Sequence, residues 1–305
     1  MGEFTLRQLE YFVAVLEHGS LTEAAKQSNI SQAGASMAIA QLEKSLGMDL
    51  LIRTRSKKVA PTAAGQELGT RARRILAEAA ELPAALNDGR DQMRGRVAIG
   101  CMTAISPRII PQLLGRISRR WPDIRLEFVE GPAEELQHAV ADGTLDLALV
   151  YSLQAVADVD LLVLTESRPH FMLAATHPLA ARDSLRFADL AQEDVILLDV
   201  PPSAERVISM FRAAGVEPRV RWRSVVAETI RGIVASGQAC SVTHVWPGMV
   251  PNYLGANIRL VPITDETPPN RLVAAVAPGV RRPRRVEEVI ATAKDLASAA
   301  GPGDG

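Results

Sequence analysis

The stretch that decides the fold is residues 19–47, GSLTEAAKQSNISQAGASMAIAQLEKSLG. Ser20 opens a capping-box pattern and therefore predicts the start of a short helix. Asn29 predicts the turn that ends it, because Asn tolerates turn conformations. Ser31 is placed to cap a second, longer helix, which Gly47 ends. The stretch thus predicts two helices of unequal length joined by a tight turn.

Another helix is expected before this pair. Thr5 and Gln8 have the spacing of a capping box, and Gly19 is placed to end the helix. Apolar residues at helical spacing supply one stripe for packing: Leu6, Leu9, Phe12, Val13 and Leu16. The inward positions of the helix capped by Ser31 are Ala35, Ile39, Leu42 and Leu46.

This order of helices is typical of a helix-turn-helix, whose second helix offers its first residues to base edges. Those residues are Ser31, Gln32 and Ser36. Gln pairs bidentately with adenine, and Ser donates to phosphates or bases, so the chemistry fits direct readout. A three-helix bundle with polar caps fits the helix spacing equally well.

A small basic hairpin is expected over residues 50–62, where apolar and polar residues alternate briefly. Its basic side chains are Arg53, Arg55, Lys57 and Lys58. Residues 53–74 carry seven basic residues and one acidic residue, whereas the whole chain has a net charge of -1. Such a wing would lie along the phosphate backbone, and the alternative is a merely solvated face.

A long helix follows over residues 63–87, with Thr62 as its cap. Its apolar seam, formed by Leu68, Ile75, Leu76, Ala79 and Leu82, indicates a dimer interface. Pro83 removes a helical hydrogen bond, so the helix should bend or end near it.

From Arg96 onward, strands alternate with helices, which predicts an α/β domain with a parallel sheet. The expected strands are 97–100, 124–129, 145–150, 162–164, 170–174, 195–198, 220–224, 241–243, 258–262 and 272–276. The expected helical segments are 105–120, 134–142, 187–190, 204–214, 228–236 and 286–297.

Ligands of open α/β sheets bind at the carboxyl ends of the strands, so residues after the strands are the effector candidates. They are Cys101, Met102, Thr103, Glu130, Tyr151, Val200, Pro201, Pro202, Ser203, Thr243 and His244. Thr103 is the favoured polar contact, and a helix cap is its alternative role. Tyr151 and His244 have structural roles as alternatives. Cys101 and Cys240 are either buried small hydrophobes or a redox switch.

Composition narrows the class of protein. Two cysteines in 305 residues form no disulfide framework, the N-terminus has no signal-peptide pattern, and every apolar run is too short for a membrane span. We therefore expect a cytoplasmic protein with no membrane contact. Metal-ligand spacings, phosphate loops and nucleophile elbows are absent from the sequence, so no metal, cofactor or enzyme activity is expected. A small-molecule-binding protein or an enzyme with a two-lobed α/β cleft remains the alternative.

The first sixty-five residues resemble the LysR-type transcriptional regulators. The resemblance rests on Leu6–Phe12, Gly19–Ala25, Ile30–Gln32 with Ser36, Ile39 and Gln41–Glu43, Leu46–Gly47, Leu51–Arg53 and Pro61–Gly65. It implies a winged helix-turn-helix (1–62), a dimerising linker helix (63–92) and a periplasmic-binding-protein-like effector domain (93–305). The effector domain would have one lobe from 95–165 and 265–300 and another from 166–264. The implied partners are double-stranded DNA, a small-molecule effector of unknown identity and further copies of the chain as a homodimer or homotetramer, with RNA polymerase as a candidate.

Three positions depart from the family pattern, which usually has Pro or Ser at Ala33, Ala at Gly34 and a long polar residue at Met37. Compared with the usual family residues, the side chains at these positions form fewer hydrogen bonds. Base reading is therefore expected to depend on Gln32, on contacts of Ala33 or Met37 with thymine methyl groups, and on DNA shape.

Overall fold

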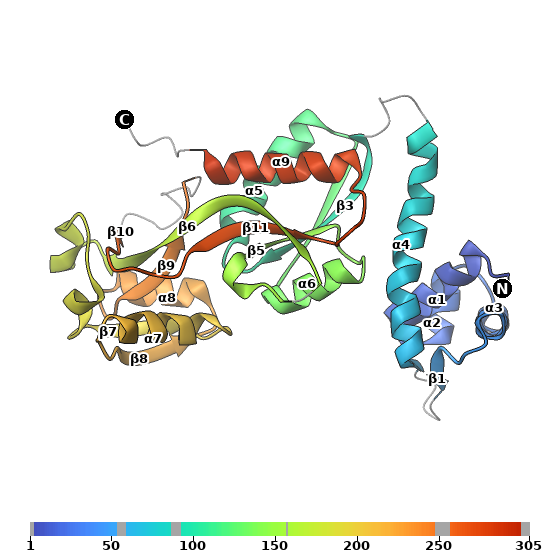
Figure 1. Cartoon of the computed structure of the whole chain (residues 1–305), viewed down its shortest axis with the longest axis horizontal. Coiled ribbons are helices and arrows are strands. Elements are labelled where there is room, and N and C mark those ends of the chain that lie inside the picture. The colour runs from blue at the N-terminus through green and yellow to red at the C-terminus, as the bar shows by residue number, and fades with distance from the viewer. Residues whose placement is uncertain (1–2, 54–58, 87–92, 157, 248–256, 300–305) are drawn as a thin grey trace. The chain divides into compact units, whose positions relative to one another are not determined.

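The computed structural model describes residues 3–53, 59–86, 93–156, 158–247 and 257–299 (Figure 1). The chain divides into two compact units. One contains Met1–Met93 and His138–Asp146, and the other contains Arg94–Gln137 and Leu147–Gly305.

Three short helices begin the first unit: α1 (Leu6–His18), α2 (Leu21–Gln27) and α3 (Gln32–Leu46). The predicted capping box is confirmed, since the Thr5 hydroxyl accepts from the Gln8 amide at 3.2 Å and the Gln8 side chain accepts from the Thr5 amide at 2.8 Å. The Ser31 hydroxyl accepts from the Gly34 amide at 3.0 Å, as expected for the cap of α3.

The core of this unit contains the predicted inward residues Leu9, Phe12, Ile39 and Leu42, all fully buried. Leu6 was predicted to share this stripe, and that prediction is wrong, because its side chain is 46% exposed. The helical repeat identifies the apolar face of α1, but it does not show which part of that face is covered by neighbouring elements. On α1, burial begins only at Leu9.

The predicted hairpin is present as the antiparallel strands β1 (Leu51–Arg53) and β2 (Val59–Pro61), followed by α4 (Ala63–Leu86). Thr62 joins the hairpin to α4. Its amide donates to the Leu50 carbonyl at 2.9 Å and its hydroxyl to the Asp49 carbonyl at 2.8 Å, while that hydroxyl accepts from the Gly65 amide at 3.0 Å. Thr62 therefore caps α4, as expected, and α4 ends three residues after Pro83.

The second unit begins with a parallel βαβαβ sheet, as predicted. Strand β3 (Gly95–Met102) lies between β4 (Ile124–Gly131) and β5 (Leu147–Tyr151), and it pairs in parallel with both. Strand β11 (Asn270–Val276) then pairs with β5 in the antiparallel direction. Helices α5 (Ser106–Arg120) and α9 (Arg284–Ser298) contact each other beside this sheet, and α6 (Ala133–Ala141) connects β4 with β5 (Figure 1).

One long strand, β6 (Asp160–Ala174), replaces the two strands predicted at 162–164 and 170–174. Its first half pairs with β11, and its second half pairs with β9 (Ser241–Val245) and β10 (Ile258–Pro262). The segment between the two predicted strands contains Pro169 and polar residues, so its composition does not predict that the strand is continuous. Strand β6 thus runs from one lobe into the other.

The remaining elements belong to the second lobe. Strands β7 (Asp194–Leu198) and β8 (Arg219–Ser224) pair in parallel beside α7 (Ser203–Ala213) and α8 (Ala227–Ala235) (Figure 1). Three short 3-10 helices also occur in this unit: η2 (Ser152–Gln154), η3 (Pro178–Ala181) and η4 (Phe187–Leu190). Phe171, Phe187 and Phe211 form the aromatic centre of the lobe, and the closest pair of ring centroids is 4.6 Å apart. Within the described residues, none of the helices has both the length and the apolar content needed to span a bilayer.

Candidate functional site

The first turns of α3 present a polar and apolar surface to solvent. Gln32 and Ala33 are exposed, Ser36 is half-buried, and Met37 is 73% exposed. The buried residues Ala35, Ile39 and Leu42 form one stripe that anchors the helix. Ala33 and Met37 lie opposite this stripe, whereas Gln32 is exposed because it is the first residue of α3, ahead of the buried part.

The turn before α3 has the expected geometry. Asn29 has a φ of 53°, in the left-handed region that Asn tolerates better than most residues. The Ile30 amide donates to the Ala25 carbonyl at 3.0 Å, which fixes the approach of the chain to Ser31. The Ser31 hydroxyl accepts a hydrogen bond from the Gly34 amide and therefore caps α3. Because Ser31 is also exposed, its hydroxyl can make an outward contact as well.

The predicted basic wing is described only at its base. Arg53 ends β1, and its side chain lies outside the described residues. The other three predicted phosphate contacts, Arg55, Lys57 and Lys58, also lie outside them.

Effector candidates at the end of β3 have different environments. Cys101 is fully buried and Met102 nearly so, whereas Thr103 and Glu130 are exposed. Thr103 is not a helix cap, because α5 begins after Ile105 with no side-chain cap. The Thr103 hydroxyl is thus placed at the surface beside the carboxyl end of β3.

Tyr151 and His244 come together in a polar network, although 93 positions separate them in the sequence. Their ring centroids are 5.4 Å apart, and Tyr151 also lies edge-on to Trp246. Burial raises the pKa of the Tyr151 phenol to about 12, so it stays protonated at neutral pH. Thr243 precedes His244 on β9 and is half-buried.

The protonation state of His244 follows from its neighbours. The Asn270 Oδ1 accepts the Arg271 amide at 3.0 Å, so its Nδ2 faces His244 Nε2 at 3.5 Å. Nε2 therefore accepts, and Nδ1 carries the proton toward the Ser167 hydroxyl at 3.4 Å. Burial, with the positive charges of His170, Arg206 and Arg108, lowers the pKa of His244 to about 4. The ring is neutral at pH 7.

A second group of polar contacts joins the end of β5 to the start of α7. Gln154 Nε2 donates to the Ser203 hydroxyl at 3.4 Å, and the Arg206 guanidinium donates to the Leu153 carbonyl. The Gln154 Oε1 is buried and accepts no hydrogen bond from the described residues. Val200, Pro201 and Pro202 form the turn before Ser203, whose amide donates to the Val200 carbonyl at 2.7 Å.

Both cysteines lack the environment of a reactive thiol. Burial raises the pKa of Cys101 well above its ordinary value, and the nearby Glu130 carboxylate adds to the rise. Burial raises the pKa of Cys240 to about 12. Because the thiolate is the reactive species, these positions favour the buried-hydrophobe role over a redox switch.

Sequence reasoning missed Gln154, Arg206 and Asn270. Gln154 lies three residues beyond Tyr151, which was a candidate, so a wider window after the strand would have included it. Arg206 and Asn270 join the network only through contacts with residues distant in sequence, at Leu153 and His244.

A helix-turn-helix unit followed by an α/β unit of two lobes is the arrangement of a DNA-binding protein with a ligand-binding domain. Comparisons with known proteins agree. The family model described as "Bacterial regulatory helix-turn-helix protein, lysR family" matches residues 6–66, and the model "LysR substrate binding domain" matches residues 90–298.

Individual relatives extend the match. The chain is 31% identical over 242 residues to the DNA-binding transcriptional dual regulator OxyR of Escherichia coli, covering 78% of each protein. Full-length OxyR C199D from Pseudomonas aeruginosa aligns with a TM-score of 0.78 at 25% identity, covering 98% of this chain and 100% of that one. A putative LysR family regulator from the same organism aligns with a TM-score of 0.61 at 28% identity, covering 96% and 98%.

The chain belongs to the LysR family of transcriptional regulators. It is a DNA-binding regulator with an effector-binding domain, and not an enzyme. The expected fold, a winged helix-turn-helix and linker helix followed by a two-lobed α/β domain, is confirmed.

Proposed function

We propose that this regulator reads its operator with Gln32, Ala33, Met37, Ser31 and Ser36 on α3. The observation that carries the proposal is the exposure of four of these side chains at the start of α3, where the buried stripe has not yet begun or faces the other way. The four are Ser31, Gln32, Ala33 and Met37, and Ser36 is half-buried. Gln32 is the member able to form a bidentate pair with adenine, and the 73% exposed Met37 suits contact with a thymine methyl group.

The wing residues Arg53, Arg55, Lys57 and Lys58 would neutralise phosphates, which affects all sequences alike. To test this, the full-length protein is mapped on its own chromosome, and its affinity for the operator found there and for random DNA is measured at several salt concentrations. Lys57→Ala should weaken both complexes by a similar factor and lower the salt slope by about one. Loss of operator affinity alone would assign a base contact to Lys57.

We further propose that the effector binds at the polar network around Tyr151 and His244, together with Thr103, Ser203 and Thr243. Two features support this site. The buried Gln154 Oε1 lacks a hydrogen-bond donor among the described residues, and the positive charges of Arg206 and Arg108 act electrostatically on His244. Positive potential with hydroxyl donors suits a carboxylate, so we infer an anionic small molecule that also donates a hydrogen bond to Gln154.

Gln154→Met tests this site. The substitution keeps the length of the side chain. It removes an unsatisfied buried acceptor and one long hydrogen bond, from Gln154 Nε2 to Ser203 at 3.4 Å, so the melting temperature should change little. Small carboxylic acids and their neutral amides are screened by calorimetry against both proteins. The proposal expects an acid that binds the unsubstituted protein at least tenfold better than Gln154→Met, and better than its own amide. Equal binding of acid and amide, or equal binding by the two proteins, would contradict it.

Three further proposals follow from family membership. The functional boundaries are the DNA-binding domain at 1–62, the linker helix at 63–92 and the effector domain at 93–305. The regulator acts in the cytoplasm as a homodimer or homotetramer, and it contacts RNA polymerase at its promoters. Sedimentation of the full chain with operator DNA tests the assembly, and co-purification with polymerase on that DNA tests the contact.

A further inference from the structure

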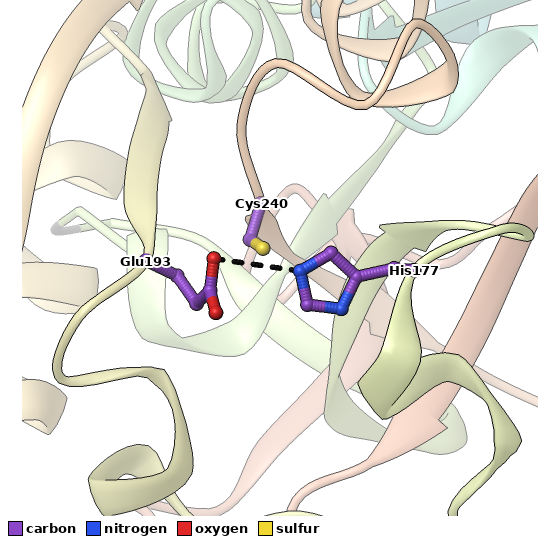
Figure 2. Close-up of side chains that lie close together, drawn as sticks. All are labelled: His177, Glu193 and Cys240. Atoms are coloured by element: carbon purple, nitrogen blue, oxygen red, sulfur yellow. Dashed lines mark ion pairs between the residues drawn. The ribbon is translucent and has the colours of Figure 1, made fainter.

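Three side chains with metal-binding atoms meet in the second lobe, and none of them belongs to the proposed effector network. His177 precedes η3, Glu193 precedes β7, and Cys240 precedes β9. Figure 2 shows the imidazole, carboxylate and thiol directed toward one another from three separate segments. No pair of these residues has a metal-ligand spacing in the sequence, so sequence analysis found no site here.

The distances between these atoms are close to those of a metal site. The ligating atoms all lie within 4.8 Å of one another, and His177 Nε2 is 3.4 Å from Glu193 Oε2. A tetrahedral zinc ion with bonds of about 2.0–2.3 Å separates neighbouring ligand atoms by roughly 3.3–3.6 Å. The imidazole and carboxylate already fit, and the thiol needs only a small shift.

A cavity of about 160 Å³ adjoins the three side chains. Its other lining residues include Gln192, Asp194 and Arg219. The volume exceeds the roughly 30 Å³ that a water molecule occupies in the liquid, so a fourth, solvent ligand has room. Asp194 adds negative charge at its edge, although Arg219 and Arg221 pair with that carboxylate.

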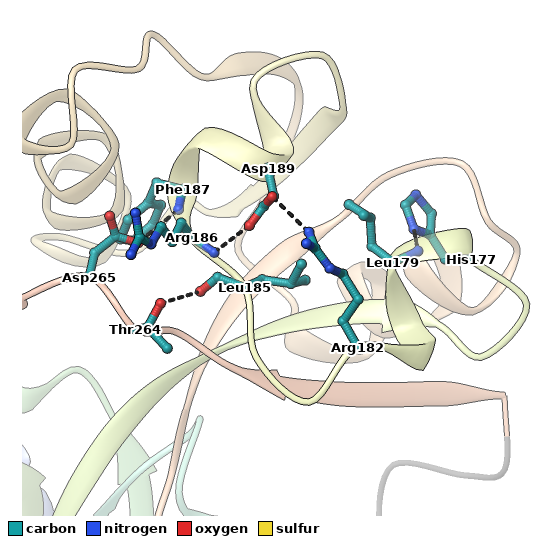
Figure 3. Close-up of polar contacts among 9 residues, drawn as sticks. All are labelled: His177, Leu179, Arg182, Leu185, Arg186, Phe187, Asp189, Thr264 and Asp265. Carbon is teal, nitrogen blue, oxygen red and sulfur yellow. Dashed lines mark hydrogen bonds and ion pairs between the residues drawn. The ribbon is translucent and has the colours of Figure 1, made fainter.

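The backbone holds the three segments in place. The Cys240 amide donates to the Asp194 carbonyl at 2.8 Å, and the Cys240 carbonyl accepts from the Ile196 amide at 2.9 Å, so the thiol is fixed beside the chain that carries Glu193. Figure 3 shows how the His177 segment is tied through Arg182, whose guanidinium donates to Asp189 at 2.8 Å. The site is thus largely preorganised.

We propose that His177, Glu193 and Cys240 bind a divalent transition metal of the zinc type, with water as the fourth ligand. Thiolate and imidazole ligands favour zinc over magnesium or calcium, which prefer oxygen ligands. The bound ion links the starts of η3, β7 and β9, so it stabilises the second lobe.

Protons must move for this site to form. His177 Nδ1 accepts the Leu179 amide at 3.2 Å, so in the neutral ring Nε2 carries the proton toward Glu193. Metal binding through Nε2 moves that proton to Nδ1, with loss of the Leu179 hydrogen bond, and releases the Cys240 thiol proton to solvent. The Leu179 hydrogen bond and the direct contact between His177 and Glu193 are exchanged for three metal-ligand bonds.

The experiment is a titration of chelator-treated full-length protein with Co²⁺ alone, followed by displacement with Zn²⁺. The absorption spectrum of bound Co²⁺ shows whether a thiolate is among its ligands, because a thiolate gives a charge-transfer band in the near ultraviolet. The proposal expects one equivalent of Co²⁺ with this band, which Cys240→Ser removes. Cys101→Ser is the matched control, since Cys101 is the other buried cysteine, and it should keep the band.

Two further variants keep the proposal testable if Cys240→Ser misfolds. His177→Asn keeps a side-chain acceptor for the Leu179 amide but removes the imidazole, and Glu193→Gln removes the charge with little change in shape. Each should weaken metal affinity more than about 100-fold and abolish the rise in melting temperature that Zn²⁺ causes. Absence of the charge-transfer band, or unchanged affinity in both variants, would overturn the proposal.

Discussion

Gly65→Ala should damage the junction between the hairpin and α4. A Cβ added at Gly65 would lie 2.1 Å from the Leu50 carbonyl oxygen, far inside contact distance. That oxygen is backbone and already accepts the Thr62 amide at 2.9 Å, so it has little freedom to move. Either β1 or α4 must therefore shift.

The magnitude follows from two opposed effects. Replacing glycine by alanine gains at most about 1 kcal/mol in a helix, and Gly65 lies in the first turn of α4. Overpacking costs typically 1–3 kcal/mol, and a contact with backbone at this distance belongs at the upper end. The net loss in the first unit is thus about 2 kcal/mol. The same substitution at Gly232, in α8, meets no atom within 4 Å and should give only the gain.

Hydrogen exchange followed by mass spectrometry measures this locally. A loss of about 2 kcal/mol speeds exchange of the α1 amides, residues 6–18, by roughly 30-fold and weakens operator binding. Gly232→Ala should leave α1 exchange unchanged. Unchanged α1 protection in Gly65→Ala would refute the reasoning, because it would show that the hairpin and α4 separate without cost.

Two other expectations concern the second unit. The folded pKa of His244, about 4, lies below its unfolded value of roughly 6.5, so on acidification the unfolded state takes up the proton first. The free energy of unfolding should therefore fall by about 2 kcal/mol between pH 7 and pH 5 because of this group, and the fall should be smaller in His244→Asn. Urea titration followed by tryptophan fluorescence measures both falls. An equal dependence on pH in the two proteins would contradict the burial of the ring. In chelator-treated protein at pH 7, iodoacetamide should alkylate Cys101 and Cys240 far more slowly than free cysteine, and reaction at the free-cysteine rate would contradict their raised pKa values.

Local interactions made much of the first unit predictable. The caps at Thr5, Ser31 and Thr62 act on amides three residues away, so a short window contains both partners. The same holds for Gly19 and Gly47, whose φ values of 60° and 68° end their helices. These boundaries needed no tertiary information.

The polar network of the second unit could not be predicted from a short window of sequence. The Ser152–Asn270 contact joins residues 118 positions apart, and Gln154–Ser203 joins residues 49 apart. The first contact results from the order of strands in the sheet, with β11 next to β5, and the second from the position of α7. Periodicity determines neither. Sequence reasoning found Tyr151 and His244 because both lie near strand ends, a position that the chain itself reveals.

The most direct test of the account is the ratio of operator to random-DNA affinity in Gln32→Ala and Gln41→Ala at fixed salt. Both glutamines are exposed on α3, but Gln32 is its first residue and Gln41 lies more than two turns further along. We predict that Gln32→Ala lowers the ratio by about 1–3 kcal/mol, or roughly 5- to 150-fold, whereas Gln41→Ala leaves it unchanged. An unchanged ratio in Gln32→Ala, or an equal loss in both variants, would contradict the claim that the start of α3 reads the bases.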